Sequence, residues 1–361
     1  MAKSWLFDLV HYPHDPAPAA YDPRKAVEVF DDHLKVWEQA DRLGFEGLWL
    51  GEHHFTAYNM TPSPNVMLAA VSQRTKRMRL GIMVNVLPFH QPLRLAEEIA
   101  MLDLLTHGRL ECGLGRGVDE QEFLRLKMPY EEARPRFEEG LELMIKAWTQ
   151  SNFQHDGTFF HVGEATIYPR PLQQPHPRLW ITALSPKTID WAATRGYPMS
   201  SVFLPVDRTK AAFNNYRAAA ERAGRKVTSD DLVLARNVIV ADSMKQAREI
   251  AQPALNHVFG LFLEAAVPKD LTTLPKEYEY YKEFFRPFAG MDLSFDDLCR
   301  LGLVVVGDPS SVRDQLVAQA RETGLGHLMA WMHFGNVATA DVMRSQELYA
   351  REVLPALAGI P

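Results

Sequence analysis

Short apolar runs and longer amphipathic stretches alternate along most of the chain. The short runs are rich in β-branched and aliphatic residues, as buried strands are, and the stretches between them repeat apolar residues at helical spacing. This alternation predicts an α/β fold in which helices follow strands. The predicted strands cover Trp5–Val10, Gly47–Gly51, Arg79–Val86, Arg109–Leu114, Leu179–Ala183, Pro198–Phe203, Leu232–Val240 and Gly326–Trp331.

The clearest helical pattern lies between the first two predicted strands. Its apolar residues recur at intervals of three and four, Pro23 stands where a helix can begin, and Gly44 stands where it can end. Similar patterns predict a helix after most of the other strands. These helices cover Asn65–Thr75, Pro92–Thr106, Glu131–Gln150, Pro186–Arg195, Arg208–Gly224, Ser310–Thr323 and a stretch that begins at Ser243.

Eight units of strand and helix favour a closed parallel (β/α)8 barrel, the TIM barrel, over an open doubly wound sheet, which usually has fewer strands. Runs such as Gly81–Leu87 are almost continuously apolar, as expected for strands that are buried on both faces. The length of 361 residues is compatible with two domains or with one large barrel. Because no linker interrupts the alternation, we expect residues 1–361 to form a single barrel domain.

Two connections are longer than a loop between strand and helix requires. The first, about 151–178, follows the fourth strand, and the second, about 265–300, follows the seventh. Insertions in barrel enzymes usually cover the carboxyl ends of the strands, where the chemistry takes place. The second insertion could be a lid over an apolar substrate, or a segment that packs on the outside or on a second subunit. Its aromatic residues are Tyr278, Tyr280, Tyr281, Phe284, Phe285 and Phe288.

Charge and composition narrow the class of ligand. The chain has 39 basic and 45 acidic residues, a formal net charge of −6, so no overall positive field attracts nucleic acid or an anionic membrane. No apolar run is long enough for a membrane helix, and no signal peptide is recognisable. Cys112 and Cys299 form neither a CxxC pair nor a disulfide framework. We therefore expect a soluble cytoplasmic protein that acts on a small molecule.

Ionisable side chains follow the second predicted strand directly, in the sequence Glu52-His53-His54. The carboxyl end of a barrel strand is where barrel active sites are built. Neighbouring residues of an extended segment point to opposite sides, so at most one of the histidines faces the barrel axis and a metal site is disfavoured. An imidazole there could donate to a developing anion or move a proton. The alternative is a histidine that only shapes the loop.

A glycine-rich turn, Gly113–Val118, follows the fourth predicted strand. It is not a dinucleotide-binding fingerprint, because Val118 stands where the third glycine of GxGxxG is required. Arg116 within the turn is a candidate phosphate ligand, since a guanidinium group can bind phosphate through two hydrogen bonds. Arg134, at the start of the next helix, could join it or could pair with a glutamate of its own helix.

A possible anion site also follows the fifth predicted strand. Ser185 is suited to cap the helix that starts at Pro186, and Thr188 falls in its first turn. The free N–H groups and the positive dipole end of a helix attract phosphate, and two hydroxyls would add donors. Ordinary capping, which every helix needs, is the alternative.

Seven short motifs together resemble the bacterial luciferase-like flavin monooxygenases in order and spacing. They are Gly44-Phe45, Glu52-His53-His54-Phe55, Arg74-Thr75-Lys76, Val86-Leu87-Pro88, Gly108-Arg109-Leu110, Gly115-Arg116-Gly117 and Asp190-Trp191-Ala192-Ala193. The match covers about residues 25–205 and is weaker afterwards, although residues 306–312 are similar to the turn before the family's last barrel helix. The resemblance implies a TIM barrel that binds reduced FMN at the carboxyl ends of its strands. It also implies a homodimer and a separate NAD(P)H flavin reductase that supplies the reduced flavin.

The resemblance assigns roles to single residues. The histidine that the family uses in flavin and oxygen chemistry corresponds to His53. The arginines that contact the FMN phosphate, and the hydroxyls at the helix start, correspond to Arg116, Arg134, Ser185 and Thr188.

Further flavin contacts are implied beside the third and fifth strands. Family members often have a bulged third strand with a non-prolyl cis peptide under the flavin ring, which corresponds here to Met83-Val84, followed by Asn85. Val84, Asn85 and Leu184 are therefore candidate cofactor contacts. Two departures argue against light emission and an aldehyde substrate: Gly115 replaces a cysteine of the luciferase catalytic subunit, and Leu184 replaces a glutamate.

The implied activity is that of a two-component monooxygenase, which oxygenates a small apolar or aromatic substrate with reduced FMN and dioxygen through a peroxide at the flavin 4a carbon. Insertion of oxygen beside a carbonyl, hydroxylation and epoxidation all remain open. One alternative is a hydride-transfer oxidoreductase that uses deazaflavin or FMN, and another is a non-catalytic flavin-binding subunit. A metal-dependent barrel hydrolase would need His and Asp at several strand ends, and the sequence shows no such cluster, so we expect no metal.

Overall fold

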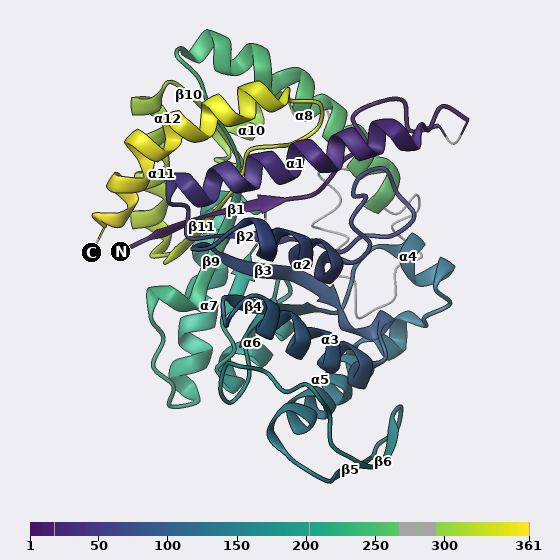
Figure 1. The fold of residues 1–361 in the computed structure, drawn as a ribbon. Helices are drawn as coiled ribbons and strands as arrows, with labels where there is room; N and C mark the ends of the chain where they lie inside the picture. Colours follow the sequence, from purple (N-terminus) through teal and green to yellow (C-terminus); the bar gives the residue numbers. More distant parts are fainter. Residues whose placement is uncertain (18, 202, 267–279, 281–293, 361) are drawn as a thin grey trace.

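Parallel strands form a closed barrel inside a ring of helices in the computed structural model of the protein (Figure 1). The structure describes residues 1–17, 19–201, 203–266, 280 and 294–360. The barrel strands, in their order around the barrel, are β1 (Lys3–Asp8), β2 (Gly47–Leu50), β3 (Arg79–Val86), β4 (Leu110–Gly115), β7 (Arg178–Thr182), β8 (Met199–Ser201), β9 (Leu232–Val240) and β11 (His327–Trp331). The predicted TIM barrel is confirmed.

The barrel is closed because its last strands pair with each other and with the first strand. Met199 of β8 pairs with Leu232 of β9, and β11 pairs with both β9 and β1. A further strand, β10 (Val304–Gly307), runs parallel to the second half of β9. The strand pattern of the sequence misses β10, because four apolar residues beside a long unpatterned segment give too short a signal.

The helices observed around the barrel include every helix that the sequence predicts. These are α1 (Pro23–Leu43), α2 (Pro64–Arg74), α3 (Pro92–Leu105), α5 (Ala133–Thr149), α6 (Pro186–Arg195), α7 (Val206–Arg222), α8 (Met244–Ala266) and α11 (Pro309–Thr323). Within the described ranges, the sequence patterns do not predict α4 (Glu120–Arg125), α10 (Phe295–Arg300) and α12 (Thr339–Ala358). Short 3-10 turns cover Leu87–Phe89, Tyr130–Glu132 and Ser229–Asp231.

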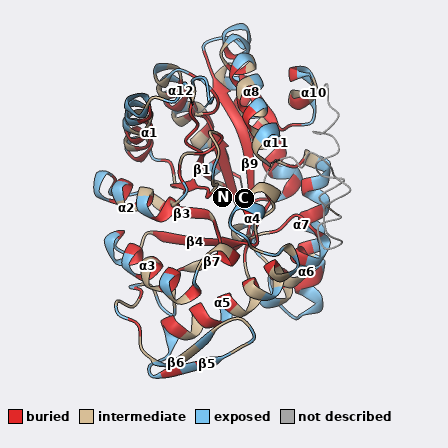
Figure 2. Ribbon diagram, turned by 90° about the vertical axis from the view of Figure 1, so that its right-hand side faces the viewer, coloured by how far each residue is buried: buried red, intermediate tan, exposed pale blue. Residues whose placement is uncertain are grey.

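Helix α1 shows how the sequence sets the limits of an element. Asp22 accepts a hydrogen bond from the backbone N–H of Arg24 at the start of the helix, and Pro23 occupies its first position. Gly44 ends it with φ of 91°, a conformation that residues with a Cβ rarely adopt, and its N–H donates to Ala40. Figure 2 shows the buried faces of the helices turned towards the barrel and the exposed faces turned outwards.

The insertion about 151–178 contains a β-hairpin next to α5. Its strands are β5 (Phe153–Asp156) and β6 (His161–Ala165), which pair antiparallel apart from the barrel sheet (Figure 1). Glu139 of α5 holds the hairpin turn, because its carboxylate accepts hydrogen bonds from three consecutive backbone N–H groups, those of Thr158, Phe159 and Phe160. Glu139 therefore fixes the hairpin turn to α5, and the buried ring of Phe153 joins β5 to the main core.

The insertion about 265–300 is described only in part. Helix α8 extends into it as far as Ala266, Tyr280 is described, and Ser294 caps α10. The predicted lid, with the rest of its aromatic residues, lies outside the described residues.

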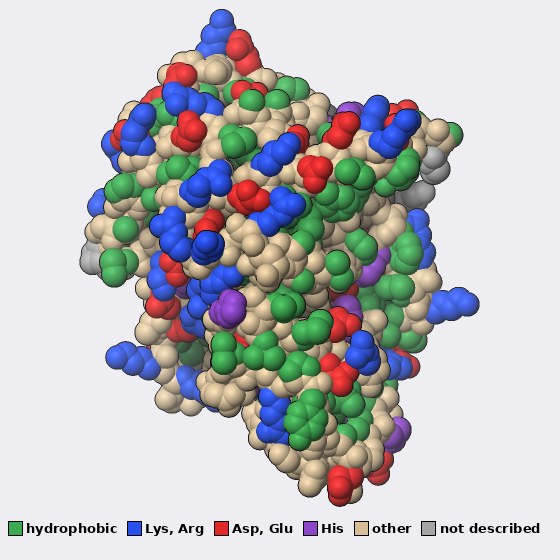
Figure 3. Space-filling model, in the orientation of Figure 1, with side chains coloured by type: hydrophobic (Ala, Val, Ile, Leu, Met, Phe, Trp, Pro, Cys, Tyr) green, Lys and Arg blue, Asp and Glu red, His purple; other side chains and the backbone are tan. Residues whose placement is uncertain are grey.

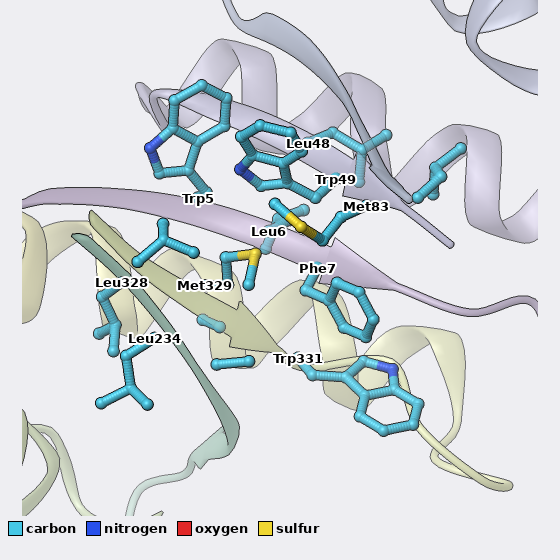
Figure 4. Close-up of a cluster of buried hydrophobic side chains, with 14 of the residues drawn as sticks. Trp5, Leu6, Phe7, Leu48, Trp49, Met83, Leu234, Leu328, Met329 and Trp331 are labelled. Carbon is cyan, nitrogen blue, oxygen red and sulfur yellow. The ribbon is translucent and has the colours of Figure 1, made fainter. Parts of the chain in front are cut away.

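Aromatic side chains fill the barrel near the amino ends of its strands. We call Trp5, Trp49, Trp180 and His327 the indole plug; neighbouring rings within it lie with their centroids 5.0 to 5.7 Å apart. Trp5 Nε1 donates to His327 Nδ1 at 2.8 Å, and burial lowers the pKa of His327 to about 3, so the imidazole stays neutral. Figure 4 shows Trp5 and Trp49 side by side, with Phe7 and Trp331 farther along the barrel. The plug leaves the carboxyl ends of the strands for a site.

Candidate functional site

An apolar cavity of about 240 Å³ lies at the carboxyl ends of the strands. Loop residues after β2, β4 and β7 line it together with residues of β1, β9 and β11. Among the described residues, the aromatic part of its lining consists of Phe7, Tyr58, Phe203, Phe259, Phe262 and Trp331. The polar part includes His53 and Arg116, so the cavity brings together two of the residues that the sequence nominates.

Two arginines and two hydroxyls meet at the Arg116 edge of the cavity, and we call Arg116, Arg134, Ser185 and Thr188 the cradle. Thr188 Oγ1 accepts hydrogen bonds from Arg116 Nη2 at 3.2 Å and from Arg134 Nη2 at 3.1 Å. Ser185 Oγ lies 2.9 Å from the same Thr188 oxygen. Two guanidinium groups that converge beside two hydroxyls form an arrangement suited to a phosphate dianion.

The amino end of α6 contributes to the cradle. Ser185 caps the helix and accepts from the backbone N–H of Thr188, and both side chains are buried. Arg134 also pairs with Glu138 of its own helix at 3.2 Å, so both pairings considered for it occur. The positive end of the α6 dipole therefore adds to the two arginine charges at one point.

His53 lines the cavity and is oriented by a carboxylate. Its Nδ1 lies 3.2 Å from Glu122 Oε1, and the backbone N–H of His54 donates to the same oxygen at 2.7 Å. Burial acts to lower the pKa of His53, but the hydrogen bond and charge of Glu122 outweigh it, and the pKa is raised. The Glu122 contact leaves Nε2 of His53 as the nitrogen that can exchange a proton with a ligand.

His54 lies on the other side of the segment, as the alternation of an extended chain predicts. Its Nε2 bonds to Glu52 Oε1 at 3.0 Å, and it is not part of the described cavity lining. The two adjacent histidines therefore have different surroundings, one at the cavity and one in the wall behind it.

Asp119 places a second carboxyl group close to His53. It caps α4, accepting from the N–H of Gln121 at 2.8 Å, and it lines the cavity. Burial, followed by the neighbouring charge of Glu122, raises the pKa of Asp119 to about 6. A carboxyl group with this pKa can hold a proton near neutral pH beside His53.

Glu52 joins the loop after β2 to β3 and the turn that follows β3. Its carboxylate accepts from Asn85 Nδ2 at 3.0 Å and from the backbone N–H of Val86 at 3.1 Å, and it bonds to His54 and His90 at 3.0 Å. Burial acts to raise its pKa, but these donors outweigh burial and hold the pKa at about 2. The ionised carboxylate therefore holds the loop after β2, which carries His53, against β3 and the turn that follows it.

Strand β3 is irregular at the position that the resemblance singles out. The Met83-Val84 peptide is cis, and the pairing register with β4 shifts between Ile82 and Asn85. Gly115 of β4 lies against this bulge, where an added Cβ would come within 2.5 Å of Val84 Cγ2. A cysteine at position 115 would therefore require Val84 to move, which gives a physical reason for the glycine.

The remaining predicted cofactor contacts separate into two groups. Val84 and Leu184 line the cavity, whereas Asn85 is absent from its described lining and directs its amide to Glu52. Asn85 thus connects β3 to Glu52, beside the cavity.

Two groups of three side chains come within 4.8 Å of one another among the described residues, close enough to admit a cation. One is His53 with Asp119 and Glu122, and the other is Asp8 with His33 and His333. Asp8 Oδ2 already accepts from Trp37 Nε1 at 2.8 Å and bonds to His33 at 2.9 Å. Hydrogen bonding accounts for these contacts, and the absence of a metal stays a prediction.

Sequence reasoning misses the carboxylates that surround His53. Asp119 caps the short helix α4 and Glu122 lies on it, almost 70 positions after His53, and six helical residues are too few to give a periodic pattern. They follow Arg116 and Gly117 closely in the sequence, just after a barrel strand. This position could have indicated them, because residues that follow the strands lie together at one end of a barrel.

Barrel, cavity and cradle together define an enzyme of the TIM-barrel class with a site for a small organic ligand. Residues 7–327 match the luciferase-like monooxygenase family. The chain belongs to this family and is a flavin-dependent monooxygenase. The sequence-based assignment of the family is confirmed.

Individual relatives and a solved structure are similar to the chain over two thirds or more of its length. The uncharacterized protein y4wF of Sinorhizobium fredii is 33% identical over 88% of both chains. The oxygenase component of the flavin-dependent trigonelline monooxygenase of Acinetobacter baylyi is 29% identical over 67% of both chains. The crystal structure of the monooxygenase RslO1 from Streptomyces bottropensis superposes with a TM-score of 0.83 at 27% identity, covering 98% of this chain and 99% of that one.

Proposed function

We propose that the protein is the oxygenase component of a two-component system that binds reduced FMN and uses dioxygen to oxygenate a small apolar or aromatic compound. The observation that carries the proposal is the convergence of Arg116 and Arg134 on the hydroxyl of Thr188, at the edge of the cavity that His53 lines. A phosphate anchor beside an apolar cavity suits FMN, whose phosphate is joined to a flat, largely apolar ring system.

The cradle would hold the FMN phosphate. Arg116 and Arg134 supply charge, Ser185 and Thr188 supply hydroxyls, and the first turn of α6 supplies backbone N–H groups. The ring system would then extend from the Arg116 edge towards Val84 and Leu184, which line the cavity. Because the phosphate charge is bound at the edge, the apolar interior need not accommodate it.

His53 would handle the proton of the oxygen chemistry. Reduced FMN supplies the electrons that activate dioxygen, and the protein contributes placement, exclusion of water and proton transfer. Glu122 fixes the imidazole through Nδ1, so Nε2 can hold or donate a proton at the cavity. Asp119 is near enough to His53 and Glu122 to influence where the proton resides.

The apolar lining favours an apolar or aromatic substrate. Rings of Phe7, Phe203 and Trp331 contact one another in the cavity wall, with centroids 5.5 to 5.9 Å apart. Such a wall offers dispersion and ring contacts to a flat substrate and keeps water from the reacting atoms.

A hydride-transfer oxidoreductase that uses deazaflavin or FMN is the second candidate. The cradle would serve a deazaflavin phosphate equally well. The pairing of His53 with Glu122, next to a second carboxyl group, instead favours chemistry that requires a proton at the cavity. A non-catalytic flavin-binding subunit would not need this pairing.

One experiment distinguishes the oxygenase from both other candidates. The protein is mixed with photoreduced FMN, dioxygen is added, and oxygen uptake is recorded together with the absorbance of oxidised FMN. For an oxygenase, oxygen uptake should run ahead of the return of oxidised FMN, and the lag should be longer than for FMN alone. The same time course with and without protein would contradict the proposal.

A separate NAD(P)H flavin reductase is the partner that this function requires. The reductase and the two free cysteines, Cys112 and Cys299, fit a reducing cytoplasm. Among the described residues, no helix combines the length and the apolar character needed to cross a membrane.

We also infer a homodimer, with α2 and α3 as the contact surface. These helices pack against each other and expose apolar side chains of Val66, Met101, Leu104 and Leu105, which are 39 to 72% exposed. Figure 3 shows hydrophobic side chains over this part of the surface. A second copy of the chain would cover the same patch on both subunits through a twofold axis.

A further inference from the structure

A buried hydrogen-bond donor in the cavity wall has no acceptor among the residues that the structure describes. Asn237 of β9 is 4% exposed, lines the cavity, and its Nδ2 makes no hydrogen bond within the described part of the chain. A buried donor without an acceptor destabilises a fold, because it loses its hydrogen bonds to water and gains none in return. Such a group in a cavity indicates a ligand that brings the acceptor.

The surroundings of Asn237 are apolar. The strand register places it opposite Val304 of β10 and Trp331 of β11. The ring of Trp331 packs against Phe7 and Phe203 at 5.6 and 5.5 Å. The wall therefore consists of aromatic rings with one amide group at the same level, and a ligand charge would find no counter-ion in its register neighbours.

This wall is separate from the cradle. Strands β7 and β8 lie between β9 and β4, whose carboxyl end leads to Arg116. A cofactor whose phosphate is bound in the cradle would therefore enter the cavity from one side, while Asn237 faces it from another. The acceptor for Asn237 is thus expected on the second ligand, the compound that is oxygenated.

We propose that Asn237 Nδ2 donates a hydrogen bond to the substrate and that the substrate is a neutral, mostly apolar ring compound with a carbonyl or similar acceptor. This assignment rests on the proposed function, both for the term substrate and for the position of the cofactor in the cradle. The rings of Phe7, Phe203 and Trp331 bind the apolar body, and the amide orients it through the acceptor atom.

The test compares matched ligands and matched variants. Dissociation constants are measured by ligand-observed NMR on protein loaded with oxidised FMN, for a series of ketones and hydrocarbons of equal shape, such as acetophenone and ethylbenzene. Asn237→Leu removes the donor and keeps the side-chain size. Ser201→Ala is the control, because Ser201 Oγ is also buried without a partner but lies outside the described cavity lining.

The unaltered chain should bind at least one ketone more tightly than its hydrocarbon by about three- to tenfold, the effect of one hydrogen bond. Asn237→Leu should abolish this preference by weakening only the ketone, and Ser201→Ala should retain it. The proposal would be overturned if each ketone bound no more tightly than its hydrocarbon, or if no ketone bound at all. It would also be overturned if the preference for the ketone survived in Asn237→Leu. A loss of FMN affinity in Asn237→Leu would overturn it as well, since the amide would then belong to the cofactor.

Because the ligands bind without turnover, the two proposals fail separately. A chain that shows the ketone preference but no early oxygen uptake refutes the oxygenase and keeps the binding site. Early oxygen uptake without a preference for ketones would refute the binding site and keep the oxygenase.

Discussion

Thr188 makes more hydrogen bonds than the capping of a helix requires. Ser185 already caps α6, yet Thr188 Oγ1 receives donors from Arg116 and Arg134, which come from β4 and α5. Arg134 also pairs with Glu138 of its own helix, and an anion at Thr188 would in addition be stabilised by both guanidinium groups. The cradle therefore has the character of a binding site, and ordinary capping does not account for it.

Arg116 should be required for the phosphate of FMN and for little else. Arg116→Ala is expected to weaken binding of reduced FMN by about 1.5–3 kcal/mol, the range for a charge-assisted hydrogen bond. Binding of reduced riboflavin, which lacks the phosphate, should change little. Anaerobic titration measures both dissociation constants. The control is Arg136→Ala, because the guanidinium group of Arg136 on α5 pairs with Glu132 in the turn before the helix. Equal losses for FMN and riboflavin would show that Arg116 contacts another part of the flavin.

The adjacent histidines should differ in their effects. His53→Ala is expected to lower coupled oxygenation about a hundredfold, as the loss of a proton-transfer group does, while FMN binding stays nearly intact. His54→Ala should act mainly on stability, because His54 bonds to Glu52 in the wall. Product yield and FMN affinity are measured for both variants. Full coupled turnover in both would remove His53 from the mechanism.

Asp119 should make stability depend on pH. Its pKa is raised from an ordinary 3.8 to about 6 in the fold, so its stabilisation is complete below 3.8 and is lost as the pH rises through 6. Asp119→Asn keeps a helix cap and removes the charge. Its free energy of unfolding should exceed that of the unaltered chain by about 1–3 kcal/mol at pH 8, and the difference should shrink towards pH 4.

Urea unfolding at several pH values measures this difference. The control is Asp314→Asn, at an exposed carboxylate. A difference that is independent of pH would mean that Asp119 is not protonated in this range.

Single residues show where sequence reasoning reaches its limit. His53, Arg116 and Thr188 were predictable because each follows a barrel strand directly or begins the helix after it. Glu122 and Asn237 were not, since one lies on a short helix and the other resembles any polar residue in a buried strand. Whether a strand residue meets a partner across a barrel depends on register, which one sequence does not specify.

At the scale of elements, Glu52 joins β2 to β3 through four donors. Glu52→Gln should reduce the free energy of unfolding by about 1–3 kcal/mol, because an amide cannot accept from all of them and adds donors of its own. Chemical denaturation measures the loss. The control is Glu97→Gln, at a partly exposed carboxylate that pairs with Arg94, and it should change stability by less than about 0.5 kcal/mol. A similar small effect of Glu52→Gln would contradict the role assigned to it.

The elements that the sequence predicts are those with long periodic patterns. Helices such as α1 and α6 carry caps that can be read from single residues, Asp22 and Ser185 among them. The short elements β10 and α4 depend on neighbours distant in sequence, since β10 exists by pairing with β9. Tertiary contacts decide elements of this length, and local propensity does not.

At the scale of the whole molecule, the exposed apolar side chains on α2 and α3 should hold two copies together. Replacing both Met101 and Leu105 by glutamate would bring like charges together across a twofold axis. The double variant is expected to sediment as a monomer with the barrel intact. Val27→Glu, on the exposed side of α1, is the control and should leave the assembly unchanged. A dimer that survives the double substitution would place the interface elsewhere.

The indole plug has a consequence for the order of events in a catalytic cycle. With Trp5, Trp49, Trp180 and His327 filling one end of the barrel, the described part of the chain forms a vessel that is closed at its base. Both ligands would therefore enter and leave at the carboxyl ends of the strands. Where one ligand covers the other, the covered ligand has to bind first and leave last, and steady-state kinetics would then show an ordered mechanism.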